Sequence, residues 1–565
     1  MVRAQRAWHY AHGPAEGDVQ IEVSVKVVVC ILSTVLLSVG LSGGAQSTAN
    51  SGVSQVFGSN MVLQRSIPAP VWGWAAPGRK VTVRIADRSA DATADANGKW
   101  MVRLQPLPAG GPYKMRIDGP QPAITFSNVL VGDVWVCSGQ SNMELGIGGT
   151  NGAKMAISHA LFPQIRLYTV PKRVAYEPQY GLARDTADLT GLWSVCTPKT
   201  IATGGWDGFS AAAYFFGRKL YQDLKVPIGL IHCSWKASLA EAWTSAEALD
   251  RLPDFSEALQ KLRATKANPF TGKQDKYPYV MTVLYNGMIA PLVPYGIKGV
   301  IWYQGESNVS RAYQYRKLLP AMIKDWRTRW GEGDFPFLIV QLANYQKSEA
   351  APKDDAWAEL REAQLRTAQT VPGTALAVTI DIGDATDIHP KDKLNVGRRL
   401  ALCAEAIAYG KRVEYSGPQV ASVGPANGGT AIRVSFNHLG GGLIAKGKAL
   451  TGFAIAGRDR RFVWAVARIQ GDSVIVSCPN VAHPAAVRYA WQSNPGCNLS
   501  NQAGLPASPF RTDSWPGLTI DAGPMILRRP PDHPYRIQKI TALAAASVTL
   551  LALATWALSR RLRAR

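Results

Sequence analysis

Three short segments of this chain carry the polar side chains that hydrolytic chemistry needs. Residues 138–143 read Ser-Gly-Gln-Ser-Asn-Met, residues 304–308 read Gln-Gly-Glu-Ser-Asn, and residues 381–390 hold three aspartates and His389. A serine becomes a nucleophile when a histidine takes its proton, a carboxylate orients that histidine, and N–H donors stabilise the oxyanion. Taken singly, the segments also fit a helix cap, a polar loop and an acidic cluster that binds a cation.

Each of these segments follows an apolar run that predicts a buried strand. The runs are continuous, as in strands covered on both faces, and lie at residues 129–137, 228–235, 299–303, 337–342 and 375–380. Amphipathic segments that indicate helices lie at residues 210–224, 311–330, 355–370 and 392–409. The alternation predicts a doubly wound parallel sheet with helical crossovers. Because the carboxyl ends of parallel strands meet at one edge, the polar segments should converge there.

Short alternating runs on both sides of this region predict additional β-structure. One run lies at residues 81–85, between turn signals, and others lie at residues 431–436 and 473–477. We therefore expect three parts, which are an N-terminal β-sandwich domain, a catalytic domain and a C-terminal β-rich domain, at residues 47–128, 129–410 and 411–527.

The two ends of the chain predict export and anchoring. Residues 1–46 contain Lys26, an apolar run and small residues, which is the pattern of a signal peptide. A linker at residues 528–539 precedes an apolar segment at residues 540–558 and a basic tail at residues 559–565. This indicates a transmembrane helix with a cytoplasmic tail. The bulk of the chain would then lie in the periplasm or outside the cell. A bacterial sorting tail and a buried core helix are the alternatives.

Composition excludes several other classes of protein. The net charge of +22 is scattered and partly terminal, without an internal basic run, so nucleic-acid binding is not expected. The seven cysteines form no CxxC pair and predict neither a zinc nor a redox motif, while their disulfide pairing stays open. The 17 tryptophans suit either a sugar binder or an ordinary core. Two glycosylation sequons, at Asn308 and Asn498, are interpreted as chance matches.

Most of residues 53–525 resembles a known family of enzymes. The segments that carry the similarity lie at residues 61–65, 70–74, 132–144, 209–217, 301–308 and 504–513. They resemble the sialate O-acetylesterase-like group of carbohydrate esterases, within the SGNH hydrolases. A G-x-S-x-G elbow of the α/β-hydrolase type is absent around Ser141. The resemblance implies an SGNH-type three-layer α/β/α domain with a parallel sheet, flanked by N-terminal and C-terminal β-sandwich-like domains.

The same resemblance implies roles for individual residues. Ser141 would be the nucleophile and His389 the general base. The family usually places its acid three residues before the histidine, where this chain has Thr386, so Asp387 is the first choice and Asp384 the second. Gln304 and the Ser141 backbone N–H are the implied oxyanion donors. Neither a metal nor an organic cofactor is needed.

One position departs from the family pattern. After Ser234 and Trp235 the family typically has two glycines, whose backbone N–H completes the oxyanion hole, and this chain has Lys236 and Ala237. A backbone N–H survives the substitution, but a lysine would be strained at a positive φ. Lys236 could also narrow the pocket or favour an anionic substrate. Asn142, Glu306 and Asn308 are expected to bind substrate.

The sequence therefore predicts a serine esterase that removes acetyl esters from sugars through an acetyl-enzyme, in the manner of a sialate 9-O-acetylesterase. An acetyl-xylan or xyloglucan esterase, an esterase or peptidase with a non-sugar substrate, and a non-catalytic sugar-binding protein with a decayed site are the alternatives. The expected partners are the acetylated glycan and the membrane. The oligomeric state stays open.

Overall fold

The computed structural model describes residues 52–183, 187–264 and 278–522. The predicted signal peptide region, linker, transmembrane helix and basic tail lie outside these described residues. Within the described ranges, no helix is both long enough and apolar enough to cross a membrane. Export and anchoring therefore stay predictions.

Six parallel strands form the central sheet, in the order β9-β11-β8-β12-β13-β14. Their bounds are Phe162–Thr169 for β9, Ile228–Ser234 for β11, Ile124–Gly139 for β8, Gly299–Tyr303 for β12, Phe337–Val340 for β13 and Thr374–Ala377 for β14. Five of them confirm the strands expected from continuous apolar runs. The sixth, β9, was not expected, and nor was the short β10 (Ser194–Cys196), which pairs antiparallel with β9 at the sheet edge.

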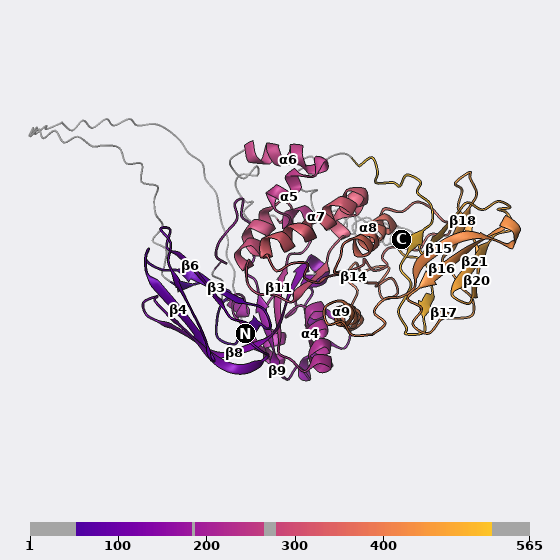
Figure 1. Ribbon diagram of the computed structural model, residues 1–565. Helices are drawn as coiled ribbons and strands as arrows, with labels where there is room; N and C mark the ends of the chain where they lie inside the picture. Colours follow the sequence, from indigo (N-terminus) through magenta and orange to yellow (C-terminus); the bar gives the residue numbers. More distant parts are fainter. Residues whose placement is uncertain (1–51, 184–186, 265–277, 523–565) are drawn as a thin grey trace, which may run out of the picture. The chain divides into compact units, whose positions relative to one another are not determined.

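Helices cover both faces of this sheet (Figure 1). Helices α4 (Ala211–Leu224) and α9 (Lys393–Ile407) pack on each other and on alternate strand residues such as Ile301. Helices α7 (Ala312–Trp330) and α8 (Ala356–Thr370) pack together and share a core with Trp302, the next residue of β12. These four helices confirm the helices predicted from the amphipathic segments of the sequence.

Strand β8 joins the N-terminal β-structure to the central sheet. Its first half pairs antiparallel with β7 (Gly110–Asp118), while its second half lies between β11 and β12. The predicted boundary between residues 128 and 129 falls inside this strand. The predicted parallel pairing is found in the six central strands, but β7 and β10 run antiparallel to their neighbours, so the full sheet is mixed.

The remaining N-terminal strands surround this junction. Strands β2, β4 and β5 extend the mixed sheet, and β1, β3 and β6 form a separate three-stranded sheet. Their bounds are Val62–Gln64 for β2, Lys80–Ile85 for β4, Arg88–Thr93 for β5, Gly52–Val53 for β1, Ala69–Trp74 for β3 and Lys99–Leu104 for β6.

The C-terminal part of the described chain contains three small antiparallel sheets. The first has the order β15-β16-β21-β20, with bounds Gln419–Ala426, Ala431–Asn437, Ser473–Ser477 and Val466–Gln470. The second pairs β17 (Leu443–Ala445) with β23 (Leu499–Asn501). The third has the order β19-β18-β22-β24, with bounds Val463–Trp464, Phe453–Ala456, Ala486–Tyr489 and Phe510–Arg511.

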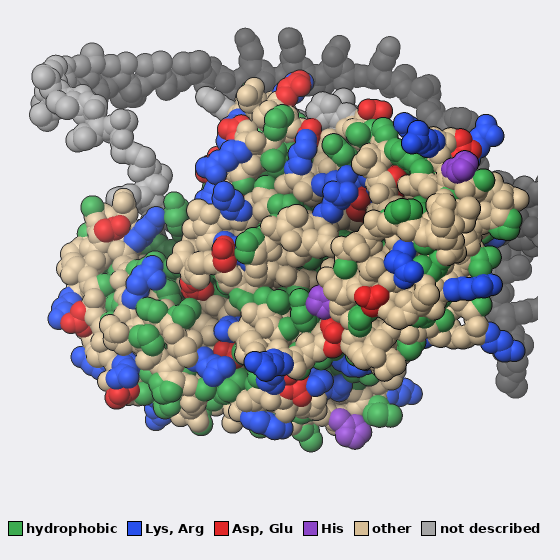
Figure 2. Space-filling model, turned by 45° about the vertical axis from the view of Figure 1, so that its right-hand side comes forward, with side chains coloured by type: hydrophobic (Ala, Val, Ile, Leu, Met, Phe, Trp, Pro, Cys, Tyr) green, Lys and Arg blue, Asp and Glu red, His purple; other side chains and the backbone are tan. Residues whose placement is uncertain are grey.

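Charged side chains are dispersed over the visible surface. Figure 2 shows Lys and Arg side chains spread among Asp and Glu side chains on this face, without a single basic patch. The six cysteines of the described ranges are free, and four of them are buried.

Candidate active site

The predicted nucleophile lies at the carboxyl end of the central strand. Strand β8 ends at Gly139, and the short helix α1 (Ser141–Glu144) begins two residues later. Gly139 has a φ of +142°, and a Cβ there would lie 2.1 Å from the Tyr303 carbonyl oxygen, so this close approach requires a glycine. Ser141 is only 9% exposed. Within the described ranges, neither its hydroxyl nor its backbone N–H has a hydrogen-bond partner.

The predicted base lies on the loop that follows β14. His389 Nδ1 is 3.3 Å from Asp387 Oδ1, and that same oxygen accepts the His389 backbone N–H at 2.9 Å. The Asp384 carboxylate instead accepts the backbone N–H groups of Thr386 and Asp387. Asp384 therefore shapes the loop, whereas Asp387 lies against the imidazole and leaves Nε2 for proton transfer.

The structure brings the serine turn and the histidine loop together through a neighbouring side chain. Asn142 Nδ2 donates to the Ile388 carbonyl oxygen at 3.0 Å, which joins the residue after Ser141 to the residue before His389. Across the described residues, no hydrogen bond between the Ser141 hydroxyl and the His389 ring is recorded. Such catalytic hydrogen bonds are often long before substrate binds.

The environment of His389 favours the neutral imidazole. Burial is the largest cause that lowers the pKa of His389 below its ordinary value, and the positive charge of Lys393 lowers it further. Asp387 acts in the opposite direction and raises it. A neutral imidazole can accept a proton from a serine near neutral pH, as a general base must.

Gln304 does not point a free donor into the site, which differs from the sequence expectation. Its side chain is completely buried, and its Nε2 donates to Asn308 Oδ1 at 2.7 Å and to the Ser238 carbonyl oxygen at 3.2 Å. Its Oε1 accepts the Tyr315 hydroxyl at 2.9 Å. Gln304 therefore holds the loops around the site in place, because both of its amide hydrogens are already used.

The expectation for Lys236 also needs correction. Its backbone N–H donates to Glu144 Oε2, at the last residue of α1, at 2.5 Å, so it is not free to bind an oxyanion. The left-handed backbone falls on the next residue, since Ala237 has a φ of +58°. Strain of this kind at a non-glycine residue is concentrated at functional sites. Ala237, in place of the second family glycine, is therefore the exceptional position.

Two of the three residues expected to bind substrate are buried, and all three are held by hydrogen bonds within the protein. Asn142 and Asn308 are each 1% exposed. Asn308 Nδ2 donates to Glu241 Oε2 at 2.8 Å, while Glu306 Oε1 accepts from Asn142 Nδ2 at 2.6 Å. Most of their polar atoms are paired inside the protein, although Glu306 Oε2 has no hydrogen-bond partner among the described residues, so the three form the framework of the site. The burial of Asn308 also agrees with a chance sequon.

Sequence reasoning missed three residues next to the site. Lys393 is completely buried and donates from Nζ to Asn142 Oδ1 at 2.6 Å. Glu144 pairs with Lys172 at 2.5 Å, and the Trp206 ring lies edge-on to His389 with 5.0 Å between centroids. A lysine in the first turn of an amphipathic helix normally faces solvent, so the sequence held no signal for Lys393.

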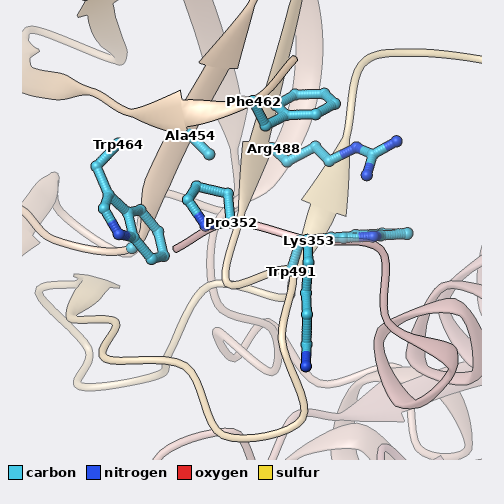
Figure 3. Close-up of a pocket in the computed structure, with 8 residues that line it drawn as sticks. Pro352, Lys353, Ala454, Phe462, Trp464, Arg488 and Trp491 are labelled. Atoms are coloured by element: carbon cyan, nitrogen blue, oxygen red, sulfur yellow. The ribbon is translucent and has the colours of Figure 1, made fainter. Parts of the chain in front are cut away.

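The best-defined pocket is elsewhere, on the C-terminal β-structure. It lies between β18, β22 and the segment around residue 352, and its lining includes Phe462, Trp464 and Trp491 (Figure 3). None of the predicted site residues lines it. In the described ranges, no group of three or more His, Cys, Asp or Glu side chains is arranged to hold a metal.

Fold and site together define an α/β protein with the side chains of a hydrolase at the carboxyl edge of its sheet. Comparison with known proteins gives the particular family. The model of the family described as "Carbohydrate esterase, sialic acid-specific acetylesterase" matches residues 131–408. Sialate O-acetylesterases from Homo sapiens and Pongo abelii are each 32% identical over 504 residues, which covers 81% of this chain and 92% of theirs.

A solved structure agrees with these relatives. A carbohydrate acetylesterase from Xanthomonas citri is 39% identical, with a TM-score of 0.73, and the match covers 82% of this chain and 100% of that one. The chain therefore belongs to the sialic acid-specific acetylesterase family of carbohydrate esterases, and it is a carboxylic ester hydrolase.

The contacts of the two aspartates give a prediction that separates them. Asp387→Asn should lower kcat by about 100-fold or more, because the imidazolium formed during the reaction loses its carboxylate. Loss of that anion also lowers the pKa of His389 further, so the acid limb of kcat/KM should move to lower pH. Asp384→Asn retains an acceptor for the loop N–H groups and should change kcat by less than about threefold. Steady-state kinetics on p-nitrophenyl acetate test both, and the opposite ranking would assign the acid to Asp384.

Proposed function

We propose that this protein hydrolyses O-acetyl esters on sugars, with Ser141 as the nucleophile, His389 as the general base and Asp387 as the orienting acid. The observation that carries the proposal is the Asp387–His389 pair, which the hydrogen bond from Asn142 to Ile388 ties to the serine turn. The half-exposed Trp206 beside His389 offers an apolar surface for a sugar ring.

The proposed mechanism has two halves with the same proton carrier. His389 Nε2 takes the hydroxyl proton as Ser141 Oγ attacks the acetyl carbonyl carbon. The oxyanion is stabilised by the backbone N–H groups of Ser141 and Ala237, for which no acceptor is recorded among the described residues. The sugar hydroxyl then leaves with the proton from His389. Water, deprotonated by the same imidazole, hydrolyses the acetyl-enzyme and releases acetate.

Charge around the site favours an acidic sugar as the substrate. Lys172 pairs with Glu144 of α1 and keeps its side chain 41% exposed, while Lys236 and Lys391 are exposed on loops that contact the same site. Cations at the rim attract an anionic ligand. The sialate O-acetylesterase relatives point the same way, since sialic acid carries a carboxylate. A neutral acetylated xylan lacks that group and is the alternative substrate.

The chain's organisation and location are part of the proposal. Division into parts at residues 47–128, 129–410 and 411–527 is supported by the separate small sheets at both ends, although β8 crosses the first boundary. Export and C-terminal anchoring are supported by the apolar segments at residues 27–39 and 540–558. Acetylated glycans outside the cytoplasm would then be within reach.

Acetate release from two substrates tests the proposal. The full chain should act on O-acetylated sialic acid with a kcat/KM at least about tenfold higher than on acetylated xylan, because the lysines attract the carboxylate. Lys236→Ala should reduce this preference, and Lys261→Ala, at an exposed lysine on α6 (Pro253–Ala264), should leave it unchanged. A folded protein that releases acetate from neither substrate, and does not react with a fluorophosphonate probe, would refute the proposed function.

A further inference from the structure

Lys393 is an unusual lysine because it is completely buried. It is the first residue of α9, and its Nζ donates to Asn142 Oδ1 at 2.6 Å while lying 5.0 Å from the centroid of the Tyr303 ring. Within the ranges that the structure describes, Lys393 takes part in no ion pair. A buried lysine without a paired carboxylate is costly and rare. A buried lysine at this position, beside the serine turn, therefore suggests a functional role.

Several charged groups surround this side chain without pairing with it. Carboxylates of Glu306, Asp387 and Asp392 raise the pKa of Lys393, but burial is the largest cause and lowers it to about 7. Burial likewise raises the pKa of Glu306, whose Oε2 is enclosed and has no hydrogen-bond partner among the described residues. On the other side, the positive charge of Lys393 lowers the pKa of His389. Lys393 thus acts electrostatically on the candidate base.

Hydrogen-bond chemistry shows what Lys393 does to Asn142. In its ammonium form Lys393 can only donate, so the atom of the Asn142 amide that faces it is then the oxygen. The amide nitrogen must then face the other way, where it donates to Ile388 O at 3.0 Å and to Glu306 Oε1 at 2.6 Å. Without Lys393, the Asn142 oxygen would lose the one donor it has among the described residues, and only the nitrogen side of the amide would still be held. The connection between the serine turn and the histidine loop would then be weaker.

We propose that Lys393 is a positioning residue of this esterase, which fixes the Asn142 amide so that Ser141 and His389 are held in register. The inference rests on the catalytic roles proposed above for Ser141 and His389. It adds a link that the sequence motifs do not contain, from the start of α9 through Asn142 to the Ile388 carbonyl.

Lys393→Met tests this role, because methionine has a similar length and no donor. We expect kcat on p-nitrophenyl acetate to fall by about 10- to 100-fold, since small displacements of reacting groups are costly. KM should stay within about twofold, and fluorophosphonate labelling of Ser141 should slow by the same factor as kcat. Lys393→Arg retains a donor and a positive charge, and should recover at least about a third of the lost activity.

The pH profile separates positioning from a merely structural role. Since Lys393 lowers the pKa of His389, its removal in Lys393→Met raises that pKa, and the acid limb of kcat/KM should move to higher pH. Lys393→Arg should leave the limb in place. A double variant with Asn142→Ala should lose no more activity than the worse single variant, because both changes break the same connection.

The control lies just beyond the other end of the same helix. Lys411 is partly exposed and pairs with Glu405 at 2.8 Å. The Lys411→Met variant should therefore have the activity of the parent protein. A Lys393→Met protein with parental kcat and an unmoved acid limb would overturn the inference, as would additive losses in the double variant. If Lys393→Met does not fold, Lys393→Arg and Asn142→Ala decide, because Asn142→Ala alone should also slow fluorophosphonate labelling. An active Ser141→Ala variant would instead refute the proposed function itself.

Discussion

Replacement of Ser141 by alanine should lower acetate release by about 10,000-fold or more, the loss expected when the nucleophile of a serine hydrolase is removed. The residue lies at the start of α1, at the carboxyl end of the central strand, with a hydroxyl that the described residues leave unpaired. The substitution removes one small oxygen and should leave the free energy of unfolding nearly unchanged. A loss of rate without a loss of stability would indicate that Ser141 has a catalytic and not a structural role. Intact-protein mass after incubation with a fluorophosphonate should show no adduct in Ser141→Ala.

A second serine, at the end of the strand that precedes Ser141, offers a matched control. Ser138 is fully buried three residues earlier, and its Oγ has no hydrogen-bond partner in the described part of the chain. Ser138→Ala removes an unsatisfied buried hydroxyl, which is neutral or slightly stabilising. Its kcat should stay within about twofold of the parent. Retention of more than a tenth of the parental rate in Ser141→Ala would assign the nucleophile to another residue.

Much of the central fold could be predicted because local signals and tertiary packing agree. Helices α4, α8 and α9 each begin directly after a side chain that caps them, namely Ser210, Asp355 and Asp392. The strands between them were visible as continuous apolar runs. Where the apolar pattern is broken, the prediction failed. Strand β9 contains Arg166, which is buried and donates to the carbonyl oxygens of Asn60, Asn128 and Pro163.

The candidate site divides in the same way between local and distant effects. Short-range geometry agrees with the first choice of carboxylate, because Asp387 lies two residues before His389 and its side chain contacts the ring. The sequence could not show whether the Gln304 amide is free to donate to an oxyanion. Its amide donates to Asn308, which is near in the chain, and to Ser238, which is far away in the chain. Strand ends thus predict which polar residues gather at the site. They do not predict which polar atoms stay free once neighbouring loops close over them.

The C-terminal β-structure should contribute to stability through a single buried arginine. Arg361 of α8 is completely buried and donates to four backbone carbonyl oxygens at 2.7–2.8 Å: those of Leu342, Ala343, Gln492 and Ser493. Burial lowers the pKa of Arg361 to about 9, and the Asp355 carboxylate offsets this only in part. Two of the carbonyls follow β13 and two follow β22. The arginine therefore binds the C-terminal β-structure to the central domain.

This connection continues toward the candidate base. Tyr345 N–H donates to the Ser493 carbonyl oxygen at 3.1 Å, and Tyr345 forms a β-bridge with Asp384. Asn344 Oδ1 accepts the Gly383 N–H at 2.7 Å. The segment after β13 is thus held by the C-terminal part on one side and supports the start of the histidine loop on the other. Loss of the Arg361 contacts should weaken both the attachment of the C-terminal part and the support of the histidine loop.

Arg361→Met should lower the free energy of unfolding by about 3–5 kcal/mol, because four buried carbonyl groups lose their donor and methionine supplies none. Urea denaturation followed by tryptophan fluorescence measures this change. Arg361→Lys should recover only part of it, since one ammonium cannot reproduce the planar fork that reaches four acceptors. Arg366→Met, on the same helix at a side chain that is 53% exposed and paired with Glu362, should cost less than about 1 kcal/mol. Equal losses for Arg361→Met and Arg366→Met would show that the C-terminal β-structure is held by its other contacts and that Arg361 adds little to them.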